Sequence, residues 1–102
     1  MAFNGTEGGF ISLQAGAALT EEYRDKNPNE TIAHFFGNQK LKQLMDQEGA
    51  VGLRMYYGTD EDGNKQLVLV AADADQNDIL DLVLDLSSPC PNLCSSPNPL
   101  NS

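Results

Sequence analysis

The spacing of apolar residues changes from helical to alternating at residue 50, and this change constrains the fold more than any other feature of the sequence. In residues 50–57, apolar side chains alternate with others, which is typical of a strand with one buried face. Residues 65–72 become apolar on both faces, and residues 79–86 carry leucine at every second position. The acidic segments 59–64 and 73–78 between them have the composition of tight turns. The sequence therefore predicts a three-stranded antiparallel meander.

The first half of the chain carries apolar residues at helical spacing. One helix is predicted over residues 12–26, because the Ser12 hydroxyl can cap its first turn and Pro28 disfavours its continuation. A second helical stretch is predicted over residues 30–48, and Gly37 either breaks or bends it. We expect these two or three helices to pack on one face of the meander, which gives an α+β fold.

The ends of the chain differ in composition from its middle. We expect a flexible N-terminal arm over residues 1–10, one α+β domain over residues 11–86, and a tail over residues 87–102. The tail has four Pro and five Ser in sixteen residues, so we expect it to be extended. The arm has neither a cationic start nor a long apolar stretch, so the cytoplasm is the default expectation. Export by a signal-independent route is the alternative if the two cysteines form a disulfide.

The charge of the chain excludes some partners. Six Lys and Arg residues against fifteen Asp and Glu residues give a formal net charge of −9. Six scattered cations cannot build the basic patch that contacts phosphates, so we expect no nucleic acid partner. The longest unbroken apolar run is six residues, against the roughly 20 that span a bilayer, so we expect no membrane insertion.

Cys90 and Cys94 are the only cysteines, and they have C-x3-C spacing within the tail. The leading interpretation is a disulfide that closes a small ring and stiffens the tail. Free thiols and a catalytic redox pair stay open, although the spacing is one residue longer than in redox-active C-x-x-C motifs. A zinc site also stays open, with His34 and a carboxylate, or a second subunit, supplying the other ligands.

The pair Glu30 and His34 has both a chemical and a structural interpretation. His34 follows Glu30 by four residues, so on a helix the carboxylate could orient the imidazole as a general base. No nucleophile or metal motif completes that arrangement, so we expect a structural histidine and no enzyme.

The acidic turns place oxygen-bearing side chains at alternate positions, as a calcium-binding loop does. The residues concerned are Asp60, Asp62 and Asn64 in one turn, and Asp73, Asp75 and Asn77 in the other. Neither turn has the glutamate that completes such a loop, so we expect solvated hairpin turns and assign no metal or cofactor.

The second face of the predicted sheet is the strongest candidate site. We expect the helices to cover the first face, formed by Val51, Leu53, Met55, Tyr57 and the leucines at 80, 82, 84 and 86. The second face then presents Arg54, Tyr56, Val83 and one set of aliphatic residues from the central strand. That set is Val68 and Val70, which we take as the candidates, or their neighbours Leu67 and Leu69. A solvent-exposed sheet face should be polar, so aliphatic residues beside an Arg and a Tyr indicate a contact surface. The alternative is that the arm (Phe3, Phe10) or the tail (Leu93, Leu100) folds over this face. The contact surface and the covered face are compatible if subunits exchange arms.

The run from Ile11 to Tyr57 (ISLQAGAALTEEYRDKNPNETIAHFF and GAVGLRMYYG), with the Cys-Pro tail and Asn-Pro-Leu, resembles small uncharacterised α+β proteins of Bacteroidota. The likeness covers most of the chain and implies a bacterial source, but no activity, cofactor or site residue. We expect a small acidic, non-enzymatic module for protein interaction or self-assembly, whose partner is itself or another protein. The alternatives are a metal-binding domain (zinc at Cys90 and Cys94, or calcium at the acidic turns) and a small enzyme using His34 and Glu30.

Overall fold

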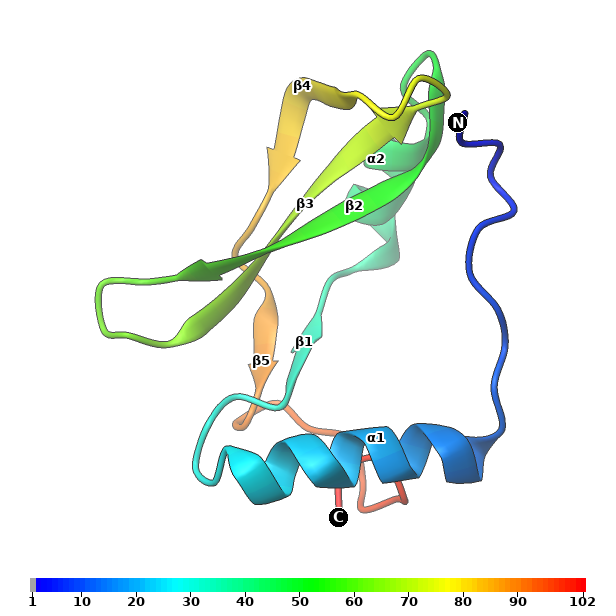
Figure 1. Ribbon diagram of the computed structural model, residues 1–102. Coiled ribbons are helices and arrows are strands. Elements are labelled where there is room, and N and C mark those ends of the chain that lie inside the picture. Colours follow the sequence, from blue (N-terminus) through cyan, green and yellow to red (C-terminus); the bar gives the residue numbers. More distant parts are fainter. Residues whose placement is uncertain (1) are drawn as a thin grey trace. The chain divides into compact units, whose positions relative to one another are not determined.

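The computed structural model describes residues 2–102 and is α+β (Figure 1). Its elements in chain order are α1 (Leu13–Lys26), β1 (Ala33–Phe35), α2 (Asn38–Met45), β2 (Ala50–Thr59), β3 (Lys65–Asp73), β4 (Asp78–Leu84) and β5 (Ser88–Cys90).

The chain forms two compact units, and each unit is built from two separate segments. The sheet unit contains the residues up to Gly8 and residues 36–87, and the helix unit contains residues 9–35 and 88–102. The expected division into arm, domain and tail stays a prediction, because a compact unit is not the same as an independently folding domain.

The sheet unit contains the predicted three-stranded antiparallel sheet, in the order β2-β3-β4. The bounds of its strands differ from the predicted ones by two residues at most. α2 lies behind β2 and β3 in Figure 1 and contacts both strands. Its Leu44 is buried, and so are the β3 residues Leu69 to Ala72. The central strand is therefore the core of this unit, as its apolar composition predicts.

The two turns of the sheet share one hydrogen-bonding pattern, which explains where the chain reverses. They are the sequences D-E-D-G-N (60–64) and D-A-D-Q-N (73–77). In each loop, Oδ1 of the first Asp accepts hydrogen bonds of 2.9–3.0 Å from the amides of the third and fifth residues. The fourth residue is in the left-handed region, with φ of +83° at Gly63 and +71° at Gln76. Both acidic segments are thus hairpin turns, as predicted.

The predicted burial of the leucine row on β4 is wrong. Leu80, Leu82 and Leu86 are 70%, 45% and 93% exposed. The cause is the register, because Ile79 pairs with Ala71 while Leu84 pairs with Leu69. Four β4 residues therefore lie opposite one β3 residue, and the alternation of buried and exposed positions is lost.

The first face is also less covered than predicted, since Met55 and Tyr57 are exposed on β2. α2 has eight residues and is about 12 Å long, which is shorter than the strands that it would have to cover.

The predicted helix over residues 30–48 is also wrong in its first half. Residues 33–35 form β1, which pairs antiparallel with β5, and the Ile32 amide donates to the Cys90 carbonyl oxygen at 2.8 Å. Asn29 has a φ of +68°, which ends the preceding turn outside the helical region. Gly37 then serves as the N-cap of α2. Pairing with a distant strand has overridden the local helical spacing.

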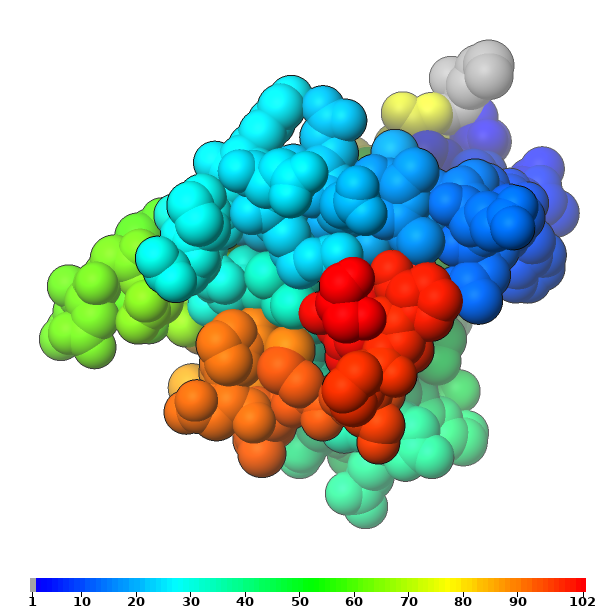
Figure 2. Space-filling model, turned by 90° about the horizontal axis from the view of Figure 1, so that it is seen from below, coloured from blue at the N-terminus to red at the C-terminus, as the bar shows by residue number. Residues whose placement is uncertain are grey.

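In the helix unit, α1 confirms the first predicted helix. Its N-cap is Ser12, whose hydroxyl accepts a hydrogen bond from the Ala15 amide at 3.0 Å. The C-terminal segment lies along α1 (Figure 2). Arg24 fixes it there by donating to the carbonyl oxygens of Leu100, at 2.7 Å, and Ser102, at 3.0 Å. The tail is a strand only in β5, and the side chains of Asn98 and Asn101 fold its last residues into a turn.

Candidate functional site

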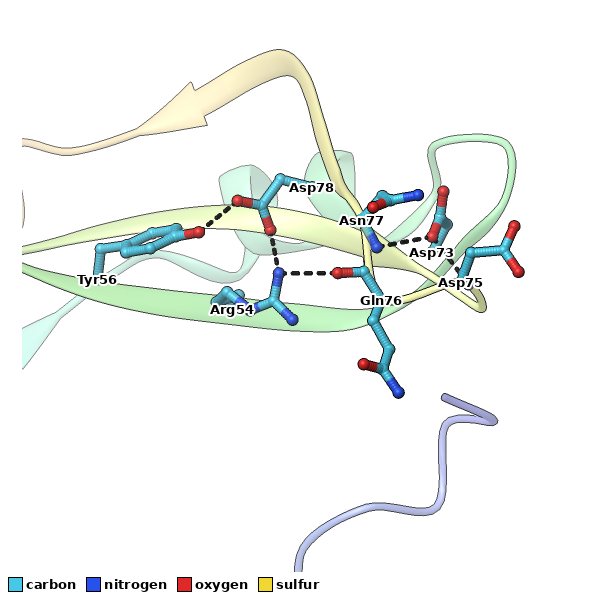
Figure 3. A network of polar contacts seen from close by, with 7 residues as sticks. All are labelled: Arg54, Tyr56, Asp73, Asp75, Gln76, Asn77 and Asp78. Carbon is cyan, nitrogen blue, oxygen red and sulfur yellow. Dashed lines mark hydrogen bonds and ion pairs between the residues drawn. The ribbon is translucent and has the colours of Figure 1, made fainter. Parts of the chain in front are cut away.

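The clearest polar cluster lies on the second face of the sheet and joins Arg54 and Tyr56 on β2 to Asp78 at the start of β4 (Figure 3). The register explains their meeting, because Arg54 pairs with Val70 while Asp78 pairs with Ala72, two positions further along β3. One carboxylate oxygen of Asp78 accepts from Arg54 Nη1, and the other accepts from the Tyr56 hydroxyl. Asp78 thereby connects the two outer strands across β3.

The hydrogen bonds of this network shift the pKa of each group further from neutrality. The Tyr56 hydroxyl, followed by the Arg54 guanidinium, lowers the pKa of Asp78 below its ordinary value. The hydrogen bond to Asp78 in turn raises the pKa of Tyr56 and that of Arg54. None of these three groups is therefore poised to exchange a proton near pH 7, so the network is suited to holding strands together.

The N-terminal arm lies on the same face. The Arg54 guanidinium is 5.6 Å from the centroid of the Phe3 ring, and the Phe3 amide donates to the Ala74 carbonyl oxygen at 2.8 Å. The Glu7 carboxylate accepts from the amides of Asn4 and Gly5, both at 2.9 Å, and these bonds lower the pKa of Glu7. Part of the second face is thus covered by the arm through Phe3.

The structure brings together four of the five residues predicted for the second face. Arg54, Tyr56, Val68 and Val70 share one side of the β2–β3 hairpin. Val70 is buried at 3% exposure, whereas Tyr56 is exposed. Val83 is 60% exposed and lies in the irregular part of β4, out of register with the others.

The prediction missed two features of this surface. It placed Asp78 in a turn, although an Asp that directly follows the D-x-D-x-N loop is the first residue of the next strand and can reach a cross-strand Arg. It also placed Leu80, Leu82 and Leu86 in the core, and the alternation of leucine with aspartate carries no signal of their exposure.

The cysteines are joined by a disulfide, as the leading interpretation predicted, with Cα atoms 4.8 Å apart. Sulfurs in a disulfide are not thiolate ligands. Both cysteines and His34 line an apolar hollow of about 370 Å³ in the helix unit. Within residues 2–102, no three His, Cys, Asp or Glu side chains gather closely enough to hold a metal ion.

The predicted helical pairing of His34 with Glu30 is wrong, because His34 lies on β1 and Glu30 on the bend before it. The four-residue spacing therefore does not place them on one helix face.

Comparison with known proteins finds no matching family model, no matching curated protein and no matching solved structure. The resemblance to proteins of Bacteroidota stays a prediction. In the described part of the chain, no helix is both long and apolar enough to cross a membrane.

Proposed function

We propose that this chain is a small acidic, non-enzymatic module that binds protein, either its own copies or another protein. The observation that carries the proposal is the surface of β4 and the residues after it. Four aliphatic residues within seven positions, Leu80, Leu82, Val83 and Leu86, are 45% to 93% exposed. Single exposed aliphatic residues are normal on a protein, and this concentration of four in one short segment is what we propose as the contact site.

The amount of exposed surface supports the same proposal. The chain exposes 7697 Å². Two globular proteins of the sizes of the sheet unit and the helix unit, taken separately, would together expose about 6,800 Å². The exposed area is thus larger than that of two compact proteins of these sizes, and association with a partner would reduce it.

The polar network supports a structural role for its own three residues, which agrees with the non-enzymatic part of the proposal. Arg54, Tyr56 and Asp78 are paired with one another, and the pKa of each is shifted further from neutrality. A group with that protonation behaviour is a poor general acid or base at pH 7.

Photo-cross-linking in the cells from which the sequence comes tests the proposal without knowledge of the partner. Leu82 is replaced by benzoylphenylalanine, and the matched control carries the same replacement at Leu19, which is 68% exposed on α1. We expect a discrete cross-linked species, a dimer or one heterologous complex, from position 82 and not from position 19. The absence of any product at position 82, or identical products at both positions, would reject the proposal.

A further inference from the structure

The sheet has two outer strands, and the arm shields the start of only one of them. β2 and β4 are the edges of the β2-β3-β4 sheet. An edge strand presents unpaired backbone groups that can accept a further strand. The arm shields the start of β2, because a Cβ on Gly5 would lie 3.3 Å from the Val51 carbonyl oxygen. Phe3 and Glu7 line a hollow of about 270 Å³ together with residues 51–54. No other described strand pairs with the outer edge of β4.

The pairing of β4 with β3 is irregular in the middle of β4. Of its residues, Asp78, Ile79 and Leu84 have register partners on β3, while residues 80–83 lie opposite Val70 alone. The exposed aliphatic residues Leu80, Leu82 and Val83 fall within this irregular stretch. The exposed aliphatic side chains therefore lie where the pairing of β4 with β3 is irregular.

The charges on this edge indicate what would bind there. Asp81 and Asp85 stand between the exposed aliphatic residues, and no ion pair in residues 2–102 includes either of them. The described ion pair nearest in sequence uses Asp78 with Arg54. Two carboxylates at a strand edge favour a cationic partner, because like charges directly opposite each other on paired strands are destabilising.

A second copy of β4 does not satisfy this requirement. An antiparallel pairing of two β4 strands centred on Val83 would place Asp81 of one copy opposite Asp85 of the other. The net charge of −9 adds a long-range repulsion between copies. The acidic edge thus favours another protein over self-association.

We propose that the outer edge of β4, residues 79–86, binds by strand addition an extended segment of another protein in which apolar and basic residues alternate. The backbone hydrogen bonds of an added strand supply affinity, and its basic side chains pair with Asp81 and Asp85. Its apolar side chains cover the exposed leucines. This inference rests on the proposed function and specifies the partner's chemistry.

The probe is a fluorescein-labelled eight-residue peptide of alternating valine and lysine, and binding to the full chain is followed by fluorescence anisotropy. One control peptide replaces lysine by glutamate, and another carries N-methyl groups on alternate amides, which block strand pairing without changing the charge. We expect binding that weakens as salt rises, because surface charges are screened. We expect at least tenfold weaker binding of both control peptides, and increased amide protection in residues 79–86 when the valine–lysine peptide is bound.

Matched variants place the site on β4. Asp81→Asn with Asp85→Asn should weaken binding of the valine–lysine peptide at least tenfold. Glu61→Gln with Asp62→Asn removes the same charge from the β2–β3 turn and should leave binding unchanged. Equal weakening of peptide binding in both double variants would show that the acidic protein attracts the peptide without a specific site. That result would overturn the inference.

Two other results would also overturn it. One is binding of the N-methylated peptide as tightly as the unmodified peptide, and the other is no binding of either. The cross-linking experiment separates this inference from the proposed function. A product at position 82 that contains only two copies of this chain would reject the basic partner and retain the interaction module, whereas no product would reject both.

Discussion

Gln76 occupies a backbone position that usually belongs to glycine. Its φ is +71°, and the equivalent residue of the preceding hairpin is Gly63, with φ of +83°. A left-handed conformation costs an L-residue other than glycine about 1–2 kcal/mol. The Gln76 side chain points away from the polar network in Figure 3, and its contribution there is the backbone carbonyl, which accepts from Arg54 at 3.2 Å. The residue is therefore replaceable without loss of the network.

Gln76→Gly should raise the free energy of unfolding by about 0.5 kcal/mol. Relief of the left-handed strain exceeds the added entropy of the unfolded chain, which is about 0.4–1 kcal/mol for glycine. Urea denaturation at pH 7 measures the change. The reciprocal variant, Gly63→Gln, should lower the same free energy by about 0.5 kcal/mol, because the same two terms act in the opposite direction. Destabilisation by Gln76→Gly would contradict the strain argument.

At the scale of elements, the Asp78 carboxylate links β4 to β2 through its hydrogen bonds with Arg54 and Tyr56. The pKa of Asp78 is lowered in the folded state, so its contribution to stability is present above the ordinary pKa of about 3.9 and is lost as pH falls through the lowered value. The pKa of Tyr56 is raised, so its contribution is present below about pH 10 and is lost as pH rises through the raised value.

Asp78→Asn should therefore lower the free energy of unfolding between these two pH limits. That free energy should also depend less on pH on both the acid and the alkaline side. Some acid dependence should remain, because the pKa values of Asp60 and Glu7 are also lowered by backbone hydrogen bonds. Urea denaturation from pH 3 to pH 11 provides the measurement. Asp75→Asn removes one charge from the same hairpin and serves as the control; the same flattening in both variants would contradict the role given to Asp78.

The elements that could be predicted from the sequence are those whose determinants are local. Ser12 caps α1, and a D-x-D-x-N turn bounds each hairpin, so the first helix and the three long strands follow from short segments. β1 and β5 have three residues each, and neither has a partner close in sequence, so the pairing of Ala33 with Cys90 leaves no local pattern. The exposure of the β4 leucines depends on a register irregularity, which residue spacing does not encode. The candidate surface could therefore be predicted only in part.

At the scale of the whole molecule, the chain path passes from the sheet unit to the helix unit, back again, and finally to the helix unit. The two units also differ in what holds them. A central apolar strand forms the core of the sheet unit, whereas a disulfide and the Arg24 hydrogen bonds fix the tail of the helix unit. We therefore expect the two units to respond differently to reduction.

Removal of the disulfide by Cys90→Ala with Cys94→Ala should destabilise the helix unit by about 2 kcal/mol, the loop-closure value for a ring of this size. Native-state hydrogen exchange should show lost amide protection in β1 and β5 and retained protection in β3. Reduction of the wild type should reproduce this result, and the same reductant should not affect the double variant. Equal loss of protection in β1 and β3 would contradict the different dependence of the two units.

The pairing of β1 with β5 also affects how the protein is made. Ala33 is synthesised 57 residues before its partner Cys90, which takes about 3–11 seconds at 5–20 residues per second. During this interval the Ala-His-Phe strand and the exposed Phe35 have no β5 against which to pair. In the nascent chain residues 33–35 therefore stay without their strand partner, and the helix unit is completed only after β5 has been synthesised.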